Sequence, residues 1–351
     1  METASYLVIG GCGHQGAHIV RVLLEKYPKA KVAVMSRNPN VNTFPGAQYL
    51  KGDVTSSDDL KRVFGICKPL VVFHTAALIV AFRKKQPDSL IQAVNVDGTL
   101  KVIETCKSFG VKALVYTSST SVMHIDQSKP MTDALESGPE VNEDSKTNSY
   151  NKSKAEADRI IRAANEDNGL RTCSLRVAAI YGEFDTEQLP GYLNVLKSNQ
   201  HWMQIGKGEN RISVAYSGNV AHAHILAAEK LLAGAEGVAG EAITISDGSP
   251  KFWEHGRAVY RAAGTDVKPN QIIRIPYGLI IIVALFEEFL AWAIGRHPTL
   301  TRESILFSVN DYTAKNDKAR KVLGYNPPVG YEESLERSVK WCLENIEGLK
   351  K

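Results

Sequence analysis

Residues 6–16 read Tyr6-Leu7-Val8-Ile9-Gly10-Gly11-Cys12-Gly13-His14-Gln15-Gly16. Four apolar residues typical of a strand lead into a glycine-rich turn, and a helical pattern follows. The turn satisfies both G-x-x-G-x-x-G and G-x-G-x-x-G. A strand, turn and helix in this order bring backbone amides and the positive end of the helix dipole close to a pyrophosphate. An ordinary glycine turn is the alternative, but the flanking elements favour a dinucleotide site with contacts at Gly10, Gly13, His14, Gln15 and Gly16.

The first half of the chain alternates β-rich runs with amphipathic helical segments. Ser57 is expected to cap one helix over 58–64, and another helix is expected over 150–165. The alternation predicts an α/β fold, a Rossmann-type doubly wound parallel sheet. Its expected strands lie at 6–9, 32–35, 70–74, 113–117 and 173–177.

Beyond Gly182 the pattern changes, because proline and glycine punctuate shorter elements. A helix over 218–232 and a strand over 242–245 are expected to return to the main sheet. We therefore expect a smaller, interleaved C-terminal substrate-binding subdomain. The predicted division is a dinucleotide-binding Rossmann domain at 1–182 with return segments at about 213–247, and the substrate-binding subdomain at 183–212 and 248–346.

Composition excludes several classes of protein. With 351 residues, 44% hydrophobic content and a formal charge of +4, the chain is neither disordered nor a nucleic-acid binder. Five widely spaced cysteines and the lack of a secretion signal predict a cytoplasmic, reducing location. The apolar run at 277–295 is interrupted by Glu287 and Glu288 and is short of the ~20 apolar residues that span a bilayer. Surface attachment and a substrate-covering helix are the two interpretations of this run.

The end of the second expected strand carries Ser36 and Arg37. An NAD enzyme usually places a carboxylate there, on the ribose 2′-hydroxyl. A hydroxyl and a guanidinium suit a 2′-phosphate instead, so NADP is the preferred prediction and NAD the alternative. Asp53, after the third strand, is placed to meet the adenine edge or to form a turn.

The proton-transfer chemistry is predicted at Tyr150 and Lys154, which lie one helical turn apart on the same face. A free tyrosine titrates near ~10, and a neighbouring ammonium is expected to lower its pKa into the working range. Ser119, at the carboxyl end of the 113–117 strand, is expected to donate to the substrate oxygen. No metal is required, since His222 and His224 point to different helix faces and are expected to be solvated or capping residues.

Several motifs together resemble the extended short-chain dehydrogenases and, within them, the 3β-hydroxysteroid dehydrogenase group. The resemblance is narrower still to fungal sterol-4α-carboxylate 3-dehydrogenases (decarboxylating), and it runs over nearly the whole chain. It implies that Ser119, Tyr150 and Lys154 are catalytic, that Asn95 supports them, and that further cofactor contacts come from Val54, Thr75, Ala76, Ala77 and Val177. The motifs are Gly10 to Gly16, Gly52-Asp53-Val54-Thr55, His74-Thr75-Ala76-Ala77, Asn95-Val96-Asp97-Gly98-Thr99, Val115-Tyr116-Thr117-Ser118-Ser119 and Tyr150-Asn151-Lys152-Ser153-Lys154.

By this resemblance the substrate is a secondary alcohol or ketone on a sterol, triterpenoid or similar polycycle, and oxidation beside a carboxylate gives a β-keto acid that can lose carbon dioxide. The resemblance also implies a homodimer and peripheral attachment to the endoplasmic reticulum membrane through 277–295. Three departures stand out: Ser36 replaces an acidic residue, His14 replaces an aromatic one, and Ser213-Val214-Ala215-Tyr216 replaces Asp-Trp-Thr-Tyr.

Three other functions compete with this one. An NADPH-dependent ketoreductase that tailors a terpenoid or polyketide is favoured by Ser36 and Arg37. A nucleotide-sugar epimerase or dehydratase shares the fold, but the apolar segment 279–293 fits a lipid-like substrate better. A non-catalytic dinucleotide-sensing regulator is the hypothesis from another class, and it has no need of Tyr150 and Lys154.

Overall fold

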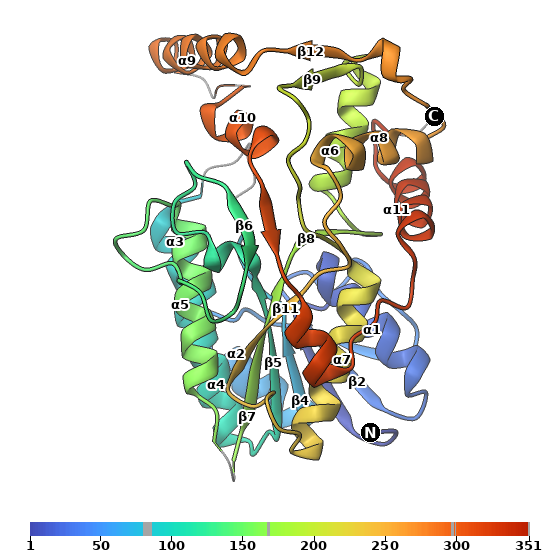
Figure 1. Cartoon of the computed structure of the whole chain (residues 1–351). Coiled ribbons are helices and arrows are strands. Elements are labelled where there is room, and N and C mark those ends of the chain that lie inside the picture. Colours follow the sequence, from blue (N-terminus) through green and yellow to red (C-terminus); the bar gives the residue numbers. More distant parts are fainter. Residues whose placement is uncertain (80–85, 167–168, 296–297, 299, 350–351) are drawn as a thin grey trace.

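A seven-stranded parallel sheet forms the centre of the computed structural model, which describes residues 1–79, 86–166, 169–295, 298 and 300–349 (Figure 1). Every neighbouring pair of its strands runs parallel. The predicted doubly wound α/β fold is therefore confirmed. From one edge to the other the strands are β11 (Glu241–Ile245), β7 (Arg171–Val177), β5 (Ala113–Ser119), β4 (Val71–His74), β1 (Ser5–Ile9), β2 (Lys31–Ser36) and β3 (Ala47–Lys51).

Both faces of the sheet are covered by helices, so its strands are buried on both sides. Alternate residues of β5 show this directly: Ala113 and Val115 pack into one core, whereas Leu114 and Tyr116 pack into the other. The first core contains α1 (His14–Lys26) and α7 (Ser217–Ala233). The second contains α2 (Ser57–Cys67), α4 (Gly98–Ser108) and α5 (Ser149–Ala163), and the short α3 (Asp88–Gln92) and the π-helical η1 (Ala93–Asp97) lead into α4.

The cap of α2 differs from the prediction. Ser56, not Ser57, precedes the helix, and its side chain accepts a hydrogen bond of 3.2 Å from the backbone N–H of Asp59. Ser57 is the first helical residue. Two adjacent serines can both fill such a position, and only the backbone geometry decides between them.

A second region lies beyond the carboxyl ends of the strands (Figure 1). A third core joins β8 (Ala179–Tyr181), β10 (Val214–Tyr216), α6 (Gln188–Lys197), α8 (Phe252–Ala262) and α11 (Tyr331–Asn345). Two further strand pairs are β9 (Met203–Ile205) with β12 (Ile273–Ile275), and β6 (Met131–Ala134) with β13 (Tyr312–Ala314). The remaining elements are α9 (Tyr277–Ala293), α10 (Arg302–Val309), η2 (Thr120–Met123), η3 (Pro269–Gln271) and η4 (Ala319–Leu323).

The chain leaves the sheet after β7 and returns to it through α7 and β11 before entering the second region again. The exact division at 1–182 with 213–247, and at 183–212 with 248–346, stays a prediction.

A group of four charges, of which Arg176 and Asp158 are buried, connects α5 to β7. Arg176 has no exposed surface and donates to Asp158 at 2.8 Å and to Glu140 at 2.5 Å. Arg162 joins the same two carboxylates at 3.0 and 2.8 Å. Opposite charges that are paired and hydrogen-bonded can be buried, whereas an isolated one cannot. The network fixes the helix that carries Tyr150 and Lys154 against the sheet.

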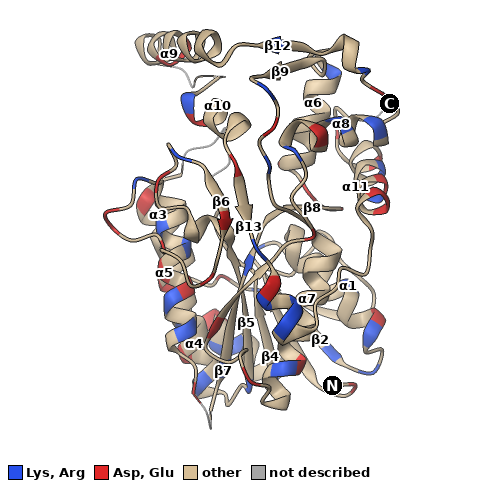
Figure 2. Ribbon diagram, viewed as in Figure 1, with Lys and Arg blue, Asp and Glu red and all other residues tan. Residues whose placement is uncertain are grey.

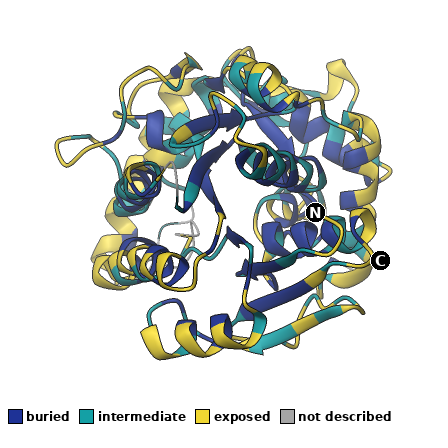
Figure 3. Ribbon diagram, turned by 90° about the horizontal axis from the view of Figure 1, so that it is seen from below, coloured by how far each residue is buried: buried dark blue, intermediate teal, exposed yellow. Residues whose placement is uncertain are grey.

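Helix α9 lies at the far end of the molecule from the sheet and is mostly exposed (Figures 1 and 3). The exposed fractions of Ile282, Phe286, Phe289 and Trp292 are 64%, 65%, 62% and 78%. In the part of the chain described, no helix has the length and apolar character needed to cross a membrane. Elsewhere, basic and acidic residues are interspersed over the elements (Figure 2).

Candidate active site

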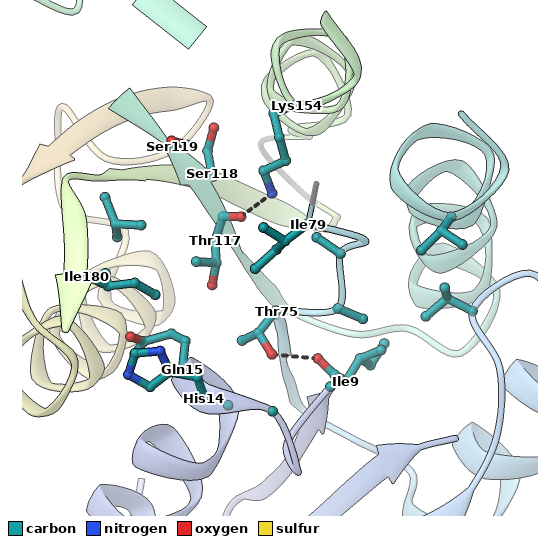
Figure 4. A pocket seen from close by; sticks show the side chains of 18 of the residues that line it. Ile9, His14, Gln15, Thr75, Ile79, Thr117, Ser118, Ser119, Lys154 and Ile180 are labelled. Carbon is teal, nitrogen blue, oxygen red and sulfur yellow. Dashed lines mark hydrogen bonds between the residues drawn. The ribbon is translucent and has the colours of Figure 1, made fainter. Parts of the chain in front are cut away.

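A cleft of about 480 Å³ follows the carboxyl ends of β1, β2, β4, β5 and β7 (Figure 4). Ligands bind at this edge in open α/β sheets. Its walls include every residue predicted to bind the cofactor and three of the four predicted to be catalytic. These are Gly10, Gly13, His14, Gln15, Gly16, Ser36, Arg37, Asp53, Val54, Thr75, Ala76, Ala77, Ser119, Tyr150, Lys154 and Val177.

The glycine turn is held by close backbone contacts. Gly10 has a φ of +86°, and a Cβ there would lie 2.8 Å from the backbone nitrogen of Ala76. A Cβ at Gly16 would lie 2.2 Å from the carbonyl oxygen of Gly10. A side chain at Gly16 would therefore push α1 away from the end of β1, and one at Gly10 would push the turn away from the loop after β4. The start of α1, with its free N–H groups, can approach a pyrophosphate only because both glycines are present.

The end of the cleft predicted to hold the adenosine carries little negative charge. Arg37 is exposed, and no ion pair to it is found within the described residues. The Ser36 hydroxyl donates to the carbonyl oxygen of Asn38 at 3.1 Å. Asp53 lines the cleft, and one of its carboxylate oxygens accepts from the backbone N–H and the hydroxyl of Thr55, both at 2.9 Å, as expected of a turn residue.

Lys154 lies on α5, 3% exposed, and reaches across to β5. Its ammonium group donates to the Thr117 carbonyl oxygen at 2.6 Å and to the Tyr116 hydroxyl at 2.7 Å (Figure 4 shows the Thr117 bond). Burial lowers the pKa of Lys154 to about 7, against a smaller upward effect of Asp158. Lys154 is therefore close to its midpoint of protonation at neutral pH.

The expectation that Lys154 lowers the pKa of Tyr150 is wrong for this structure. Burial raises the pKa of Tyr150 to about 12. The physical reason is that the ammonium is directed at β5, so removal of the phenol from water outweighs any attraction. Tyr150 is thus a protonated phenol at neutral pH and can act as a proton donor.

Ser119 is the last residue of β5, and its hydroxyl oxygen acts as a hydrogen-bond acceptor within the protein. Its side-chain oxygen accepts from the backbone N–H of Ser121 at 3.1 Å. A hydroxyl whose oxygen is already an acceptor still has its own proton to donate. The arrangement suits the predicted role of Ser119, donation to a substrate oxygen.

Asn95 is the predicted catalytic residue that does not line the cleft. It is buried in η1, where its side chain bonds both the N–H and the carbonyl of Leu78, at 2.7 and 3.2 Å, and donates to the Ser153 hydroxyl at 3.0 Å. Ser153 in turn donates to the Tyr150 carbonyl at 2.8 Å. Asn95 therefore ties the loop after β4 to the first turn of α5, which is a supporting position.

Two residues that pack against this site, Tyr116 and His224, were given no role in it by the sequence. The Nε2 atom of His224 lies 2.7 Å from the Thr117 hydroxyl, and its Nδ1 lies 2.7 Å from the Val220 carbonyl. His224 is fully buried and burial lowers its pKa to about 4, so the prediction of a solvated or capping residue is wrong. The alternation of side chains along β5 is the signal that could have placed Thr117 towards α7 and Tyr116 towards α5.

A second cleft of about 550 Å³ meets the first one at Ser119, Tyr150, Ala178 and Ala179. It extends between the sheet edge and α10, away from the glycine turn. Its lining is mixed: apolar surface comes from Ile91, Met131, Ile212, Phe307 and Tyr312, and polar side chains include Asp88, Gln127, Asn148 and Glu303. The two clefts therefore share the hydroxyl groups of Ser119 and Tyr150.

The fold and the clefts define the class of this protein, an NAD(P)-dependent oxidoreductase of the extended short-chain dehydrogenase type. The chain belongs to the 3-beta hydroxysteroid dehydrogenase/isomerase family, whose sequence model matches residues 7–276. This membership decides against a non-catalytic dinucleotide sensor.

Relatives support the same assignment over the full length of the chain. The sterol-4-alpha-carboxylate 3-dehydrogenase (decarboxylating) of Schizosaccharomyces pombe is 34% identical, over 97% of this chain and 98% of its own. Human 3 beta-hydroxysteroid dehydrogenase type 7 is 30% identical, over 96% and 95%. Among solved structures, the NAD complex of UDP-glucose 4-epimerase from Thermus thermophilus has a TM-score of 0.71 at 21% identity, covering 97% of this chain and 99% of its own, which supports the fold alone.

Lys154→Met should change how stability depends on pH. The folded-state pKa of about 7 lies below the ordinary 10.5, so between these values the unfolded chain binds more protons than the folded one. The wild type should therefore gain stability relative to Lys154→Met as pH rises from about 7 towards 10.5. Urea unfolding at several pH values measures this, and a difference that does not vary with pH would contradict a buried, near-neutral Lys154.

Proposed function

We propose that this enzyme interconverts a secondary alcohol of the 3β-hydroxyl type and the corresponding ketone on a sterol, triterpenoid or similar polycyclic substrate. The observation that carries the proposal is the meeting of the two clefts at Ser119 and Tyr150. One cleft contains the dinucleotide turn and the other has partly apolar walls, so a large apolar substrate can place its oxygen at the junction. The named activities of the relatives supply the 3-hydroxyl and the sterol class.

In this mechanism, Ser119 donates its free proton to the substrate oxygen, and Tyr150 exchanges a proton with the same oxygen. The ammonium group of Lys154, which lines the cleft, would hold the nicotinamide ribose. A bound nicotinamide supplies or accepts the hydride at the carbon that carries the oxygen. Because burial keeps Tyr150 protonated, the phenol is ready to donate to a ketone, whereas alcohol oxidation requires that its proton first be lost.

Decarboxylation follows if the substrate carries a carboxylate beside the new ketone. A β-keto acid loses carbon dioxide because the carbonyl accepts the electron pair released from the breaking carbon–carbon bond. The relative from Schizosaccharomyces pombe is named for such a reaction. We include this step as part of the proposed sterol-type activity.

A second candidate function is favoured by a specific observation: β2 ends at Ser36 and Arg37 follows it, so neither of these two positions carries a carboxylate. An NADPH-dependent ketoreductase acting on a terpenoid or polyketide requires a 2′-phosphate site at this position and a protonated Tyr150. We therefore propose a preference for NADP over NAD.

Helix α9 is proposed as a peripheral membrane contact of the endoplasmic reticulum type. Its aromatic and aliphatic side chains form a contiguous exposed apolar surface, larger than scattered apolar residues on a soluble protein. It packs next to α10, which lines the partly apolar cleft, so a lipid-like substrate could pass from the membrane to Tyr150. A substrate-covering role is the alternative.

The homodimer also stays a prediction of the family resemblance. The outer layer of the sheet offers exposed apolar side chains at Leu100 and Phe109, 41% and 40% exposed, at the two ends of α4. A dimer through paired helices is what the resemblance implies.

Tyr150→Phe should lower kcat by roughly 10²- to 10⁴-fold, because the proton donor is lost while the ring that fills the cleft wall remains. Binding of NADPH, followed by nicotinamide fluorescence, should be nearly unchanged. Tyr325→Phe is the matched control, since that phenol bonds Asp247 outside both clefts. Turnover that survives in Tyr150→Phe would remove this mechanism.

Ser36→Asp should weaken NADPH binding by roughly 10-fold or more, because a carboxylate would face the 2′-phosphate, and should spare or improve NADH binding. Ser36→Asn is the neutral control of the same size. Side-by-side titrations measure both cofactors. Equal losses for NADPH and NADH would show that no phosphate lies at Ser36.

Phe286→Glu combined with Trp292→Glu should reduce binding to vesicles of neutral and anionic lipid by about 10-fold or more, since each buried aromatic contributes about 1.5–3 kcal/mol. Vesicle flotation measures the bound fraction. Ile66→Glu, an exposed apolar residue of α2, is the control and should bind as the wild type does. Wild-type protein that stays with the buffer would contradict membrane contact.

A further inference from the structure

Tyr116 lies directly behind the predicted catalytic lysine, in the middle of the sheet. It is 1% exposed, and its hydroxyl oxygen is 2.7 Å from the Lys154 Nζ atom. The same nitrogen lies 4.2 Å from the centre of the Tyr116 ring. Lys154 is therefore held by both the polar end and the π face of one buried side chain. The mechanism above does not use this phenol.

The two acceptors of Lys154 differ in what they can do. The Thr117 carbonyl can only accept a hydrogen bond, and it accepts a stronger one from the ammonium than from the neutral amine. The Tyr116 hydroxyl can accept from an ammonium and can donate to a neutral amine. The bond to an ammonium is charge-assisted and is the stronger of the two. The Tyr116 hydroxyl therefore favours the charged form of Lys154 while remaining satisfied in either state.

The other titratable groups near Lys154 are His74, Asp158 and Tyr150. None of them takes part in the hydrogen bonds described for the Lys154 nitrogen. Burial and the nearby lysine charge lower the pKa of His74, whose ring centre is 5.4 Å from that of Tyr116, to about 3, so it stays neutral. Asp158 favours the ammonium, but its carboxylate is bonded to Arg176 and Arg162. Tyr150 is a neutral phenol at pH 7. The Tyr116 hydroxyl is the ionisable side chain that touches the Lys154 nitrogen in the described structure.

We propose that Tyr116 is a positioning residue whose hydroxyl holds Lys154 in the cleft as an ammonium, ready to contact the cofactor. The inference rests on the proposed function, because it requires Lys154 to bind the nicotinamide ribose. Sequence alone offers no reason to separate Tyr116 from the other hydroxyl residues of the run 116–121. Its role follows from the contact between β5 and α5.

The test is the pH dependence of NADPH affinity in Tyr116→Phe, measured by nicotinamide fluorescence between pH 6 and about 9. The variant keeps the ring over Lys154 and removes only the hydroxyl. The pH at which affinity falls to half of its low-pH value should move down by about one pH unit, which is about tenfold in the Lys154 protonation equilibrium. At pH 6, one unit below the wild-type Lys154 pKa of about 7, the variant should bind NADPH about twofold more weakly than the wild type.

Two further variants separate this inference from the proposed function. Tyr325→Phe loses a buried phenolic hydroxyl outside the clefts and should keep the wild-type profile. In a Lys154→Arg background the side chain stays charged throughout, so Tyr116→Phe should no longer shift the profile.

A Tyr116→Phe profile that coincides with the wild type, or one lowered equally at every pH, would overturn the role of Tyr116 alone. If Lys154→Met binds NADPH as tightly as the wild type at every pH, the proposed function of Lys154 fails first. If Tyr116→Phe does not fold, Tyr116→Met removes the hydroxyl within a similar volume and replaces it in the same titration. Its pH profile is then compared with that of the wild type, and a profile that coincides with it, or one lowered equally at every pH, would overturn the role of Tyr116.

Discussion

The approach of Gly16 to the carbonyl of Gly10 is the constraint on which the site depends. Since even a methyl group at Gly16 would lie 2.2 Å from that oxygen, the first turn of α1 packs against the end of β1 only with glycine there. This contact directs the free N–H groups of α1 at the cleft. It also sets where α7 can pack, because α7 covers α1 and brings Ser217 to His14, at 2.8 Å.

From this turn the site extends along the carboxyl edge of the sheet to α5. Helix α5 is held from behind by the buried charges of Arg176 and Asp158 and from the front by the bonds of Lys154 to β5. Tyr150 is therefore carried on a rigid helix, between a cleft with dinucleotide-binding features and a cleft with partly apolar walls. Proximity of this kind is what hydride transfer between two bound molecules requires. Helix α9 packs against α10, which lines the partly apolar cleft.

Much of the fold could be predicted from the sequence because its signals are local. The glycine turn, the alternation of strands and helices, and the spacing of Tyr150 and Lys154 are visible within short windows. The residues predicted around the cleft come from different strands, yet nearly all share one edge, because parallel strands end together. The predictions were wrong where the surroundings of a side chain depend on residues distant in the sequence. The pKa of Tyr150 is raised by burial, which the elements packed around the start of α5 produce, and the burial of His224 depends on the packing of α7 on β5. Likewise, Ser56 and Ser57 are equally good candidates for the helix cap in the sequence, and only the backbone conformation shows that Ser56 is the cap.

The central claim is that one bound nicotinamide dinucleotide places its reactive ring beside Ser119 and Tyr150. A crystal structure of the protein with NADPH tests this most directly. The account predicts the pyrophosphate over the start of α1, the nicotinamide ribose within hydrogen-bonding distance of Lys154, and the ring at the junction of the two clefts. A dinucleotide bound with its nicotinamide end away from Tyr150 would contradict it.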